Sequence, residues 1–188
     1  MNPDPLRYYD LEDYLLNEVQ DRFKSQGWIG AFDFFSIVIW KANRAKSLIA
    51  KRLHKKYPEQ GLEQIARNPT RSLHDADDDE NRLRILADWG FMLPMATAIL
   101  TILWPDEFTV YDVRVCDELD DFRNLDNLGT FEKKWARYGE YRDAVRAAVS
   151  QDISLRNKDR YLWAQYGIRR LTTDIAAGFP TPQEKQAS

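Results

Sequence analysis

The chain has 188 residues, of which 44% are hydrophobic and 13% aromatic, so it can bury one sizeable core and is expected to form a single globular domain. One cysteine excludes an internal disulfide and a four-cysteine metal site, and two histidines leave little for a metal centre, so we expect neither a metal nor a cofactor. The net charge of -3 argues against binding nucleic acid over the whole surface.

No segment of the sequence has the length and hydrophobicity of a membrane-spanning helix. The longest apolar run, 32–40, is broken by Asp33 and bounded by Lys41, whereas a bilayer needs about 20 apolar residues in succession. The opening stretch, MNPDPLRYYDLEDY, lacks the basic start and apolar middle of a signal peptide. We therefore expect a cytoplasmic protein that does not enter a membrane.

Apolar residues recur at helical spacing almost everywhere, which predicts an all-α protein. Glycine and proline interrupt helical hydrogen bonding, so Gly27, the pair Tyr57-Pro58 and Pro69 are each expected to end a helix. In chain order, the helices expected in the first half of the chain cover 11–23, 34–40, 45–53 and 59–68.

The second half of the chain begins with two helices in close succession. Gly90 suits the end of the first and Pro94 suits the first turn of the second. An extended piece, EFTVY, then precedes a helix that begins at Asp112 or Val113. We expect one domain over 1–178 and a flexible tail over 179–188. The helices expected here cover 80–89, 95–103, 131–149 and 156–176, besides the one that begins at 112 or 113.

Charged residues are unevenly distributed along the chain. No acidic residue occurs over 34–58, whereas acidic residues cluster over 75–80 and 117–121. Such a separation allows a basic surface on an acidic protein, although a run of charges also commonly serves only to solvate a helix face. The basic residues of the acid-free stretch are Lys41, Arg44, Lys46, Lys51, Arg52, Lys55 and Lys56.

Asp112 stands between Tyr111 and Val113 in the stretch FTVYDVRVCDEL. A carboxylate among apolar neighbours usually costs stability unless it has a partner or a task. One interpretation is structural, because aspartate at a helix start caps the free amides of the first turn. The other interpretation is that the carboxylate takes part in a reaction.

The segment LADWGFMLPMATAILTILWPDEFTVYDVRV combines a helix, a tight turn, a second helix, an extended piece and an aspartate at a helix start. This order resembles the core of the helix-hairpin-helix DNA glycosylases, the superfamily that includes endonuclease III and the 8-oxoguanine glycosylases. Thr97-Ala98 and the stretch 111–114, YDVR, stand where the family has two of its motifs. The resemblance covers about residues 30–170 and implies a two-lobed helical bundle with a helix-hairpin-helix.

The resemblance implies that Asp112 is a catalytic carboxylate. Cleavage of an N-glycosidic bond builds positive charge on the sugar, which a nearby anion stabilises, and the same anion can activate water. Ala96 stands where bifunctional members carry the lysine that forms a Schiff base, so a lyase step through that position is excluded and hydrolysis remains. Lys41 could replace that lysine only if it faced the same cleft; its alternative role is a contact with phosphate or solvent.

Candidate DNA contacts follow from the basic stretch and from the resemblance: Lys41, Asn43, Arg44, Lys46, Gly90 and Arg114. Arg114 either contacts phosphate or pairs with Asp112, which would lower the pKa of that carboxyl. The hairpin keeps only one of the glycines with which the family grips a phosphate, and Pro94 donates no N–H.

Four tryptophans, at positions 40, 89, 104 and 163, can stack on a flipped base, and we take Trp40 and Trp89 as the stacking candidates. Aromatic residues at helical spacing also commonly belong to the core. We expect DNA as the partner, with RNA or a protein as alternatives. The leading alternative to an enzyme is a non-catalytic member of the same fold that binds nucleic acid or a protein.

Overall fold

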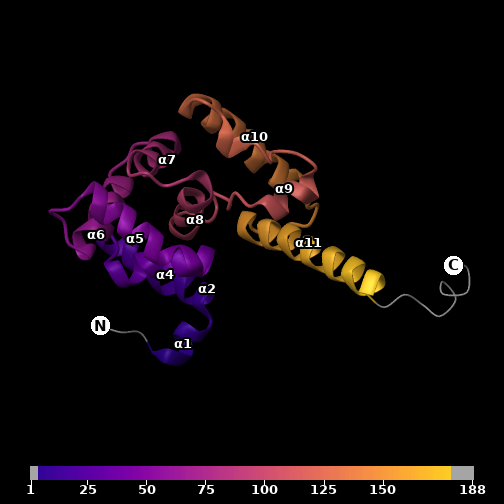
Figure 1. The fold of residues 1–188 in the computed structure, drawn as a ribbon, viewed down its shortest axis with the longest axis horizontal. Helices are drawn as coiled ribbons and strands as arrows, with labels where there is room; N and C mark the ends of the chain where they lie inside the picture. The colour runs from indigo at the N-terminus through magenta and orange to yellow at the C-terminus, as the bar shows by residue number, and fades with distance from the viewer. Residues whose placement is uncertain (1–3, 179–188) are drawn as a thin grey trace, which may run out of the picture.

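The computed structural model describes residues 4–178, and within them every regular element is helical (Figure 1). The prediction of an all-α protein is confirmed, and none of the helices formed by these residues could cross a membrane. The predicted flexible tail, 179–188, lies outside the described residues. The α-helices are α1 (Pro5–Tyr9), α2 (Leu11–Tyr14), α3 (Gln20–Gln26), α4 (Ala31–Ala42), α5 (Lys46–Lys56), α6 (Leu62–His74), α7 (Asp79–Asp88), α8 (Leu93–Leu103), α9 (Val113–Leu119), α10 (Phe131–Ala148) and α11 (Leu155–Gly178); η1 (Leu15–Val19) is a π-helical turn, and η2 (Asn43–Ala45) and η3 (Leu125–Asn127) are 3-10 turns.

Helices α2, η1 and α3 form one continuous run that the π-helical turn widens in its middle. The apolar stripe of this run is buried at Tyr14, Leu15, Val19 and Phe23. Gly27 ends the run with φ 77°, a left-handed conformation that glycine adopts without steric cost. The predicted amphipathic stripe and its stop at Gly27 are confirmed.

Helix α6 continues through Pro69, so the prediction that it ends there was wrong. Proline removes one backbone hydrogen bond from a helix, but Pro69 and Ile65 are both buried on the inner face of α6. The Thr70 hydroxyl donates to the carbonyl of Ala66 at 2.8 Å and accepts from the amide of Ile29 at 3.1 Å. Packing of this face against the core outweighs the missing bond.

Helices α7 and α8 form the predicted helical hairpin. Gly90 reverses the chain with φ 91°, and the amides of Gly90 and Phe91 bond back to carbonyls of α7 at 2.9 and 3.0 Å. Helix α8 then begins at Leu93, with Pro94 in its first turn. All residues of α8 except Pro94 are buried, so this helix lies at the centre of the core.

An extended piece of chain, 108–111, leads from the core to the start of α9. The amide of Thr109 donates to the Tyr138 hydroxyl at 3.2 Å, and that hydroxyl donates to the carbonyl of Thr109 at 2.6 Å. The Tyr141 hydroxyl donates to the carbonyl of Val110 at 2.9 Å. Because buried backbone groups need partners, the two tyrosines allow an extended piece inside an all-helical core.

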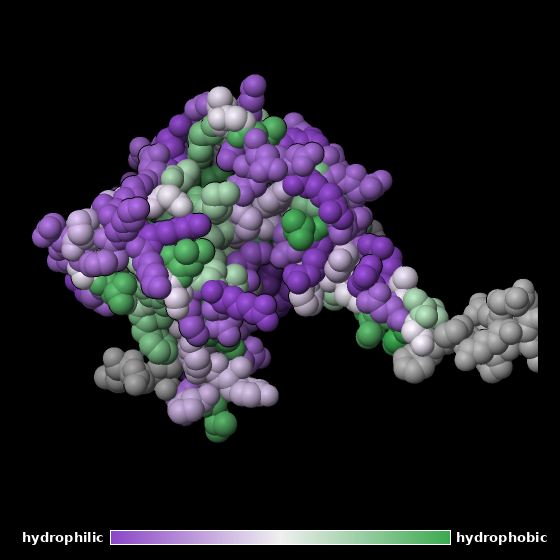
Figure 2. Space-filling model, viewed as in Figure 1, coloured by the Kyte–Doolittle hydropathy of each residue, from purple (hydrophilic) through white to green (hydrophobic). Residues whose placement is uncertain are grey.

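The helices gather in two groups that follow chain order (Figure 1). Helix α4 contacts α6 and α8, and α7 contacts both α6 and α8. Helix α9 lies along α11, while α10 contacts α7, α9 and α11. The outer half of α11 stands away from the other helices and exposes Ile168, Leu171 and Ile175 (Figures 1 and 2).

Candidate functional site

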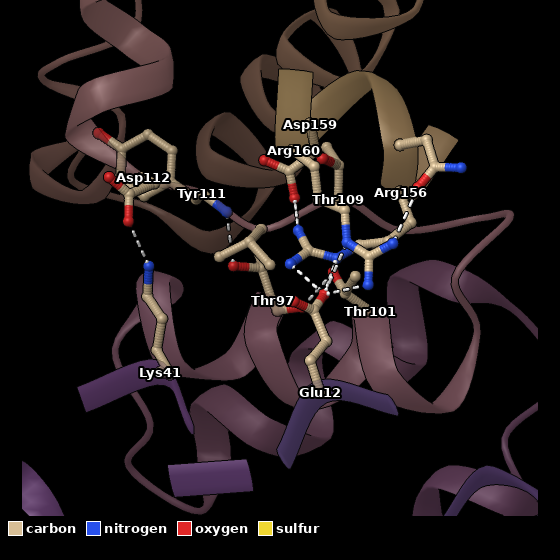
Figure 3. Close-up of polar contacts among 12 residues, drawn as sticks. Glu12, Lys41, Thr97, Thr101, Thr109, Tyr111, Asp112, Arg156, Asp159 and Arg160 are labelled. Carbon is tan, nitrogen blue, oxygen red and sulfur yellow. Dashed lines mark hydrogen bonds and ion pairs between the residues drawn. The ribbon is translucent and has the colours of Figure 1, made fainter. Parts of the chain in front are cut away.

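The carboxylate of Asp112 joins the end of α4 to the start of α9 (Figure 3). As the N-cap of α9, it accepts the amide of Arg114 on Oδ1 at 3.0 Å. Its other oxygen, Oδ2, accepts from Nζ of Lys41 at 2.7 Å. Each of the two paired side chains is only 14% exposed. The carboxylate of Asp112 therefore both caps α9 and pairs with Lys41.

The pKa of Asp112 is lowered from its ordinary value of 3.8. Burial acts in the opposite direction, because the charged form loses hydration. The ammonium of Lys41 and the amide and guanidinium of Arg114 together outweigh that effect; the Arg114 guanidinium lies 3.7 Å from Oδ1. Asp112 is therefore ionised at neutral pH.

The core holds Asp112 in place through its preceding residue. The amide of Tyr111 donates to the Thr97 hydroxyl of α8 at 2.9 Å. The Tyr111 hydroxyl donates to the carbonyl of Phe122 at 2.8 Å. Both Tyr111 and Thr97 are buried, so the carboxylate extends from a backbone that is fixed on two sides.

Asp112 lines a pocket of about 470 Å³ that is bounded by α2, α4, α9 and α11. We call it the charged pocket. Its lining combines flat aromatic rings with four cationic side chains and three carboxyl groups, and so suits a ligand that has a planar ring and negative charge. The carboxylates are Glu12, Asp112 and Asp159, the cations Lys41, Arg114, Arg156 and Arg160, and the indoles Trp40 and Trp163.

Each indole of the charged pocket has a guanidinium near its ring. The Arg156 guanidinium lies 5.0 Å from the ring centre of Trp40, and that of Arg114 lies 5.3 Å from the ring centre of Trp163. Trp163 remains 48% exposed, so much of its surface is open to a stacking partner.

Ion pairs tie α2 to α11 on one side of this pocket (Figure 3). Arg156 donates to Oε1 of Glu12 from Nε at 2.8 Å and from a terminal nitrogen at 2.5 Å. Arg160 donates to the same oxygen from Nε at 3.0 Å. Arg156 also donates to Asp159, which is 2% exposed and whose pKa is raised by burial, although Arg156 opposes the shift.

Four of the predicted residues meet in the charged pocket: Trp40, Lys41, Asp112 and Arg114. The others lie outside it. Asn43, Arg44 and Lys46 are exposed at the turn that follows α4, where Nζ of Lys46 donates to Oδ1 of Asn43 at 3.0 Å. Arg44 and Lys46 are close to Lys41 in the sequence, and we call these two residues the basic edge.

Gly90 and Trp89 lie at the hairpin, outside the charged pocket. The Trp89 ring packs on Tyr57, with ring centres 4.3 Å apart. The amide of Gly90 is used within the turn, and the amide of Leu93 donates to Oδ1 of Asp126 at 3.2 Å. These amides already have acceptors, so the turn does not present a free set of donors to a phosphate.

Four charged residues of the pocket were not predicted from the sequence: Glu12, Arg156, Asp159 and Arg160. In RNKDR the two arginines are spaced i,i+4 around the aspartate, a pattern that places both guanidiniums on one helix face. Glu12 has no comparable signal, because its contact with Arg156 joins positions 144 apart in the sequence.

Among residues 4–178, no group of three or more histidine, cysteine, aspartate or glutamate side chains is arranged to hold a metal ion. In comparisons with known proteins, no family model, curated protein or solved structure matched the chain. The geometry of the charged pocket is therefore the basis for assigning a function.

Proposed function

We propose that the protein is a monofunctional DNA N-glycosylase that hydrolyses the bond between deoxyribose and a damaged or unusual base, with Asp112 as the catalytic carboxylate. The observation that carries this proposal is an ionised carboxylate on the wall of a pocket that also holds two indoles and a surplus of positive charge. A flipped nucleotide has a planar ring to stack and phosphates to pair.

The reaction assigns one task to each kind of group. As the base departs with the bonding electrons, positive charge develops on the sugar, and the carboxylate of Asp112 stabilises it. Water then adds to C1′, and the proton that it loses is passed by Asp112 or solvent to the departed base, leaving a free base and an abasic site. Trp40 and Trp163 are the stacking surfaces in this proposal, and Lys41 and Arg114 meet the phosphates that flank the sugar.

The order of elements supports a helix-hairpin-helix glycosylase type of fold as part of the proposal. Along the chain, the α7–α8 hairpin is followed by the extended piece 108–111 and then by an aspartate at the start of α9. The two lobes would be the helices up to α8 and the helices from α9 onward, with the charged pocket between them. The hairpin amides are engaged internally, so the phosphate contacts are assigned to the pocket and to the basic edge.

A lyase step is the second candidate function, and the position of Lys41 favours it. Ala96 supplies no amine, but Nζ of Lys41 lies 2.7 Å from Oδ2 of Asp112 on the pocket wall. Once Lys41 has lost its proton to solvent, the free amine can condense with the aldehyde of an abasic sugar to give an imine and water. Borohydride reduction would trap the imine as a covalent protein–DNA product.

The test is a panel of duplexes that each carry one lesion, assayed first for abasic sites and then for borohydride trapping. Release of one base with formation of an abasic site is the expected result. Trapping by the wild type but not by Lys41→Gln would add the lyase step. Tight binding to the duplexes without release of any base would instead favour the non-catalytic nucleic-acid-binding alternative.

A further inference from the structure

We propose that Arg156 and Arg160 form a clamp for a phosphodiester of nucleic acid, and that Glu12 occupies this clamp in the free protein. The inference rests on the proposed function, since it adds a further backbone contact to those assigned to Lys41 and Arg114. Its starting point is that two guanidiniums converge on one carboxylate oxygen.

The coordination of Glu12 Oε1 is that of a strongly bound oxyanion. Arg156 contacts it at 2.8 and 2.5 Å, and Arg160 contacts it with two nitrogens, both at 3.0 Å. Guanidinium groups present N–H donors in a planar fork that matches phosphate oxygens as well as carboxylates. A phosphodiester oxygen could therefore take the place of Oε1 without a new arrangement of donors.

The clamp has anchors that do not depend on Glu12. Arg156 donates to the buried Asp159 and lies 5.0 Å from the ring centre of Trp40, and its side chain is only 12% exposed. Arg160 donates to Oδ1 of Asn157 at 2.9 Å. Both guanidiniums therefore stay oriented when the carboxylate leaves, which lowers the entropic cost of binding a replacement.

Glu12 can leave the clamp by a rotation of its own side chain, without movement of the helix that carries it. It lies in the first turn of the continuous run from α2 to α3, and α1, which precedes it, has no buried residue. Withdrawal of Glu12 would leave four cationic side chains and two carboxyl groups around the pocket. A phosphodiester, which carries one negative charge, replaces the charge that Glu12 removes.

The decisive experiment compares Glu12→Gln with Glu18→Gln in binding to a fluorescently labelled single-stranded oligonucleotide. Both changes remove one negative charge from the N-terminal segment, but Glu18 pairs with Arg7 and Arg22 outside the charged pocket. Glu12→Gln should tighten binding by roughly tenfold and steepen the log–log salt dependence by about 0.7 for one further phosphate. Glu18→Gln should do neither. Equal tightening by both variants would overturn the proposal, because net charge would then explain it.

Arg160→Gln provides a second variant that should fold normally, since its side chain is 44% exposed. Combined with Glu12→Gln it should abolish the gain in affinity, and persistence of the gain would contradict the clamp. Inorganic phosphate is the other arm: selective thermal stabilisation of Glu12→Gln by phosphate, without tighter oligonucleotide binding, would show a free-phosphate site and overturn the assignment. These measurements do not depend on base release. They therefore distinguish a protein that has the clamp but no glycosylase activity from one that is active but lacks the clamp.

Discussion

The charged pocket and the groove beside the hairpin are two hollows that share one residue. The groove, of about 280 Å³, lies between α5 and the α7–α8 turn, and its floor is apolar, with Leu53, Phe91 and Met95 among its residues. Cations occur in its lining without any carboxylate. In the charged pocket, by contrast, carboxylates and cations are tied in pairs. Lys41 lines both hollows.

The residues that the resemblance implies for one DNA-binding site therefore lie in two different hollows. Trp89 and Gly90 belong to the groove, whereas Trp40 and Asp112 belong to the charged pocket. Paired charges around aromatic rings provide a setting for a reaction on a charged ligand. The groove offers apolar contact area and cations but no carboxylate, so it lacks the anion that the proposed reaction needs.

The largest effect that would separate the two regions is expected from Asp112→Asn. Loss of the carboxylate removes the stabilisation of the developing sugar cation, so base release should fall by roughly a hundredfold or more. Abasic-site formation on the responsive duplex measures this change. The matched control is Asp78→Asn, because Asp78 caps α7 in the same way, through the amide of Asn81 at 2.7 Å. Equal rates in wild type and Asp112→Asn would remove the catalytic role.

A smaller effect is expected from the aromatic residues of the two hollows. Trp163→Ala removes a half-exposed ring from the charged pocket and should weaken binding to single-stranded DNA by roughly tenfold, the usual cost of losing one stacked base. Trp89→Ala should leave that affinity almost unchanged, since its ring already packs on Tyr57. Fluorescence anisotropy with a labelled strand distinguishes the two variants. A greater loss with Trp89→Ala would assign the nucleic acid to the groove.

The Lys41–Asp112 pair should also make the stability of the folded protein depend on pH. Because the folded-state pKa of Asp112 is lowered, the pair stabilises the fold above the pKa of the unfolded chain, and this contribution is lost as pH falls through the folded-state pKa. Wild type should exceed Asp112→Asn by about 1–2 kcal/mol at neutral pH, with the difference shrinking below about pH 4. Urea unfolding of both proteins at pH 7 and pH 3 measures it. A difference that did not change with pH would mean that the negative charge of Asp112 does not account for it.

The smallest effect is expected at the basic edge next to Lys41. Arg44→Gln and Lys46→Gln should each reduce the log–log salt slope of duplex binding by about 0.9 if each side chain meets one phosphate. The rate of base release at saturating protein should not change, because neither residue lines the charged pocket. Titrations at several salt concentrations check this. Slopes unaffected by both changes would assign the phosphate contacts to the pocket alone.

Much of the fold could be predicted because it depends on local patterns. The stop at Gly27 and the reversal at Gly90 need a left-handed backbone, and both were found from residue type. The stop expected at Pro69 failed because burial of α6 against the core is a tertiary effect that outweighs a local one. The same distinction applies to the site. Asp112 was singled out by its unusual neighbours, whereas the contacts of Asp112 with Lys41 and of Glu12 with Arg156 join distant positions in the sequence.

The extended piece 108–111 carries a consequence for the dynamics of the protein. Its amides at Thr109 and Tyr111 are bonded to side chains of α10 and α8 rather than to a neighbouring strand or helical turn, yet both residues are buried. In hydrogen–deuterium exchange these amides should therefore be protected to the level of the core helices, opening only with global unfolding. The piece 108–111 forms neither a helix nor a strand, yet it would be one of the slowest-exchanging parts of the molecule.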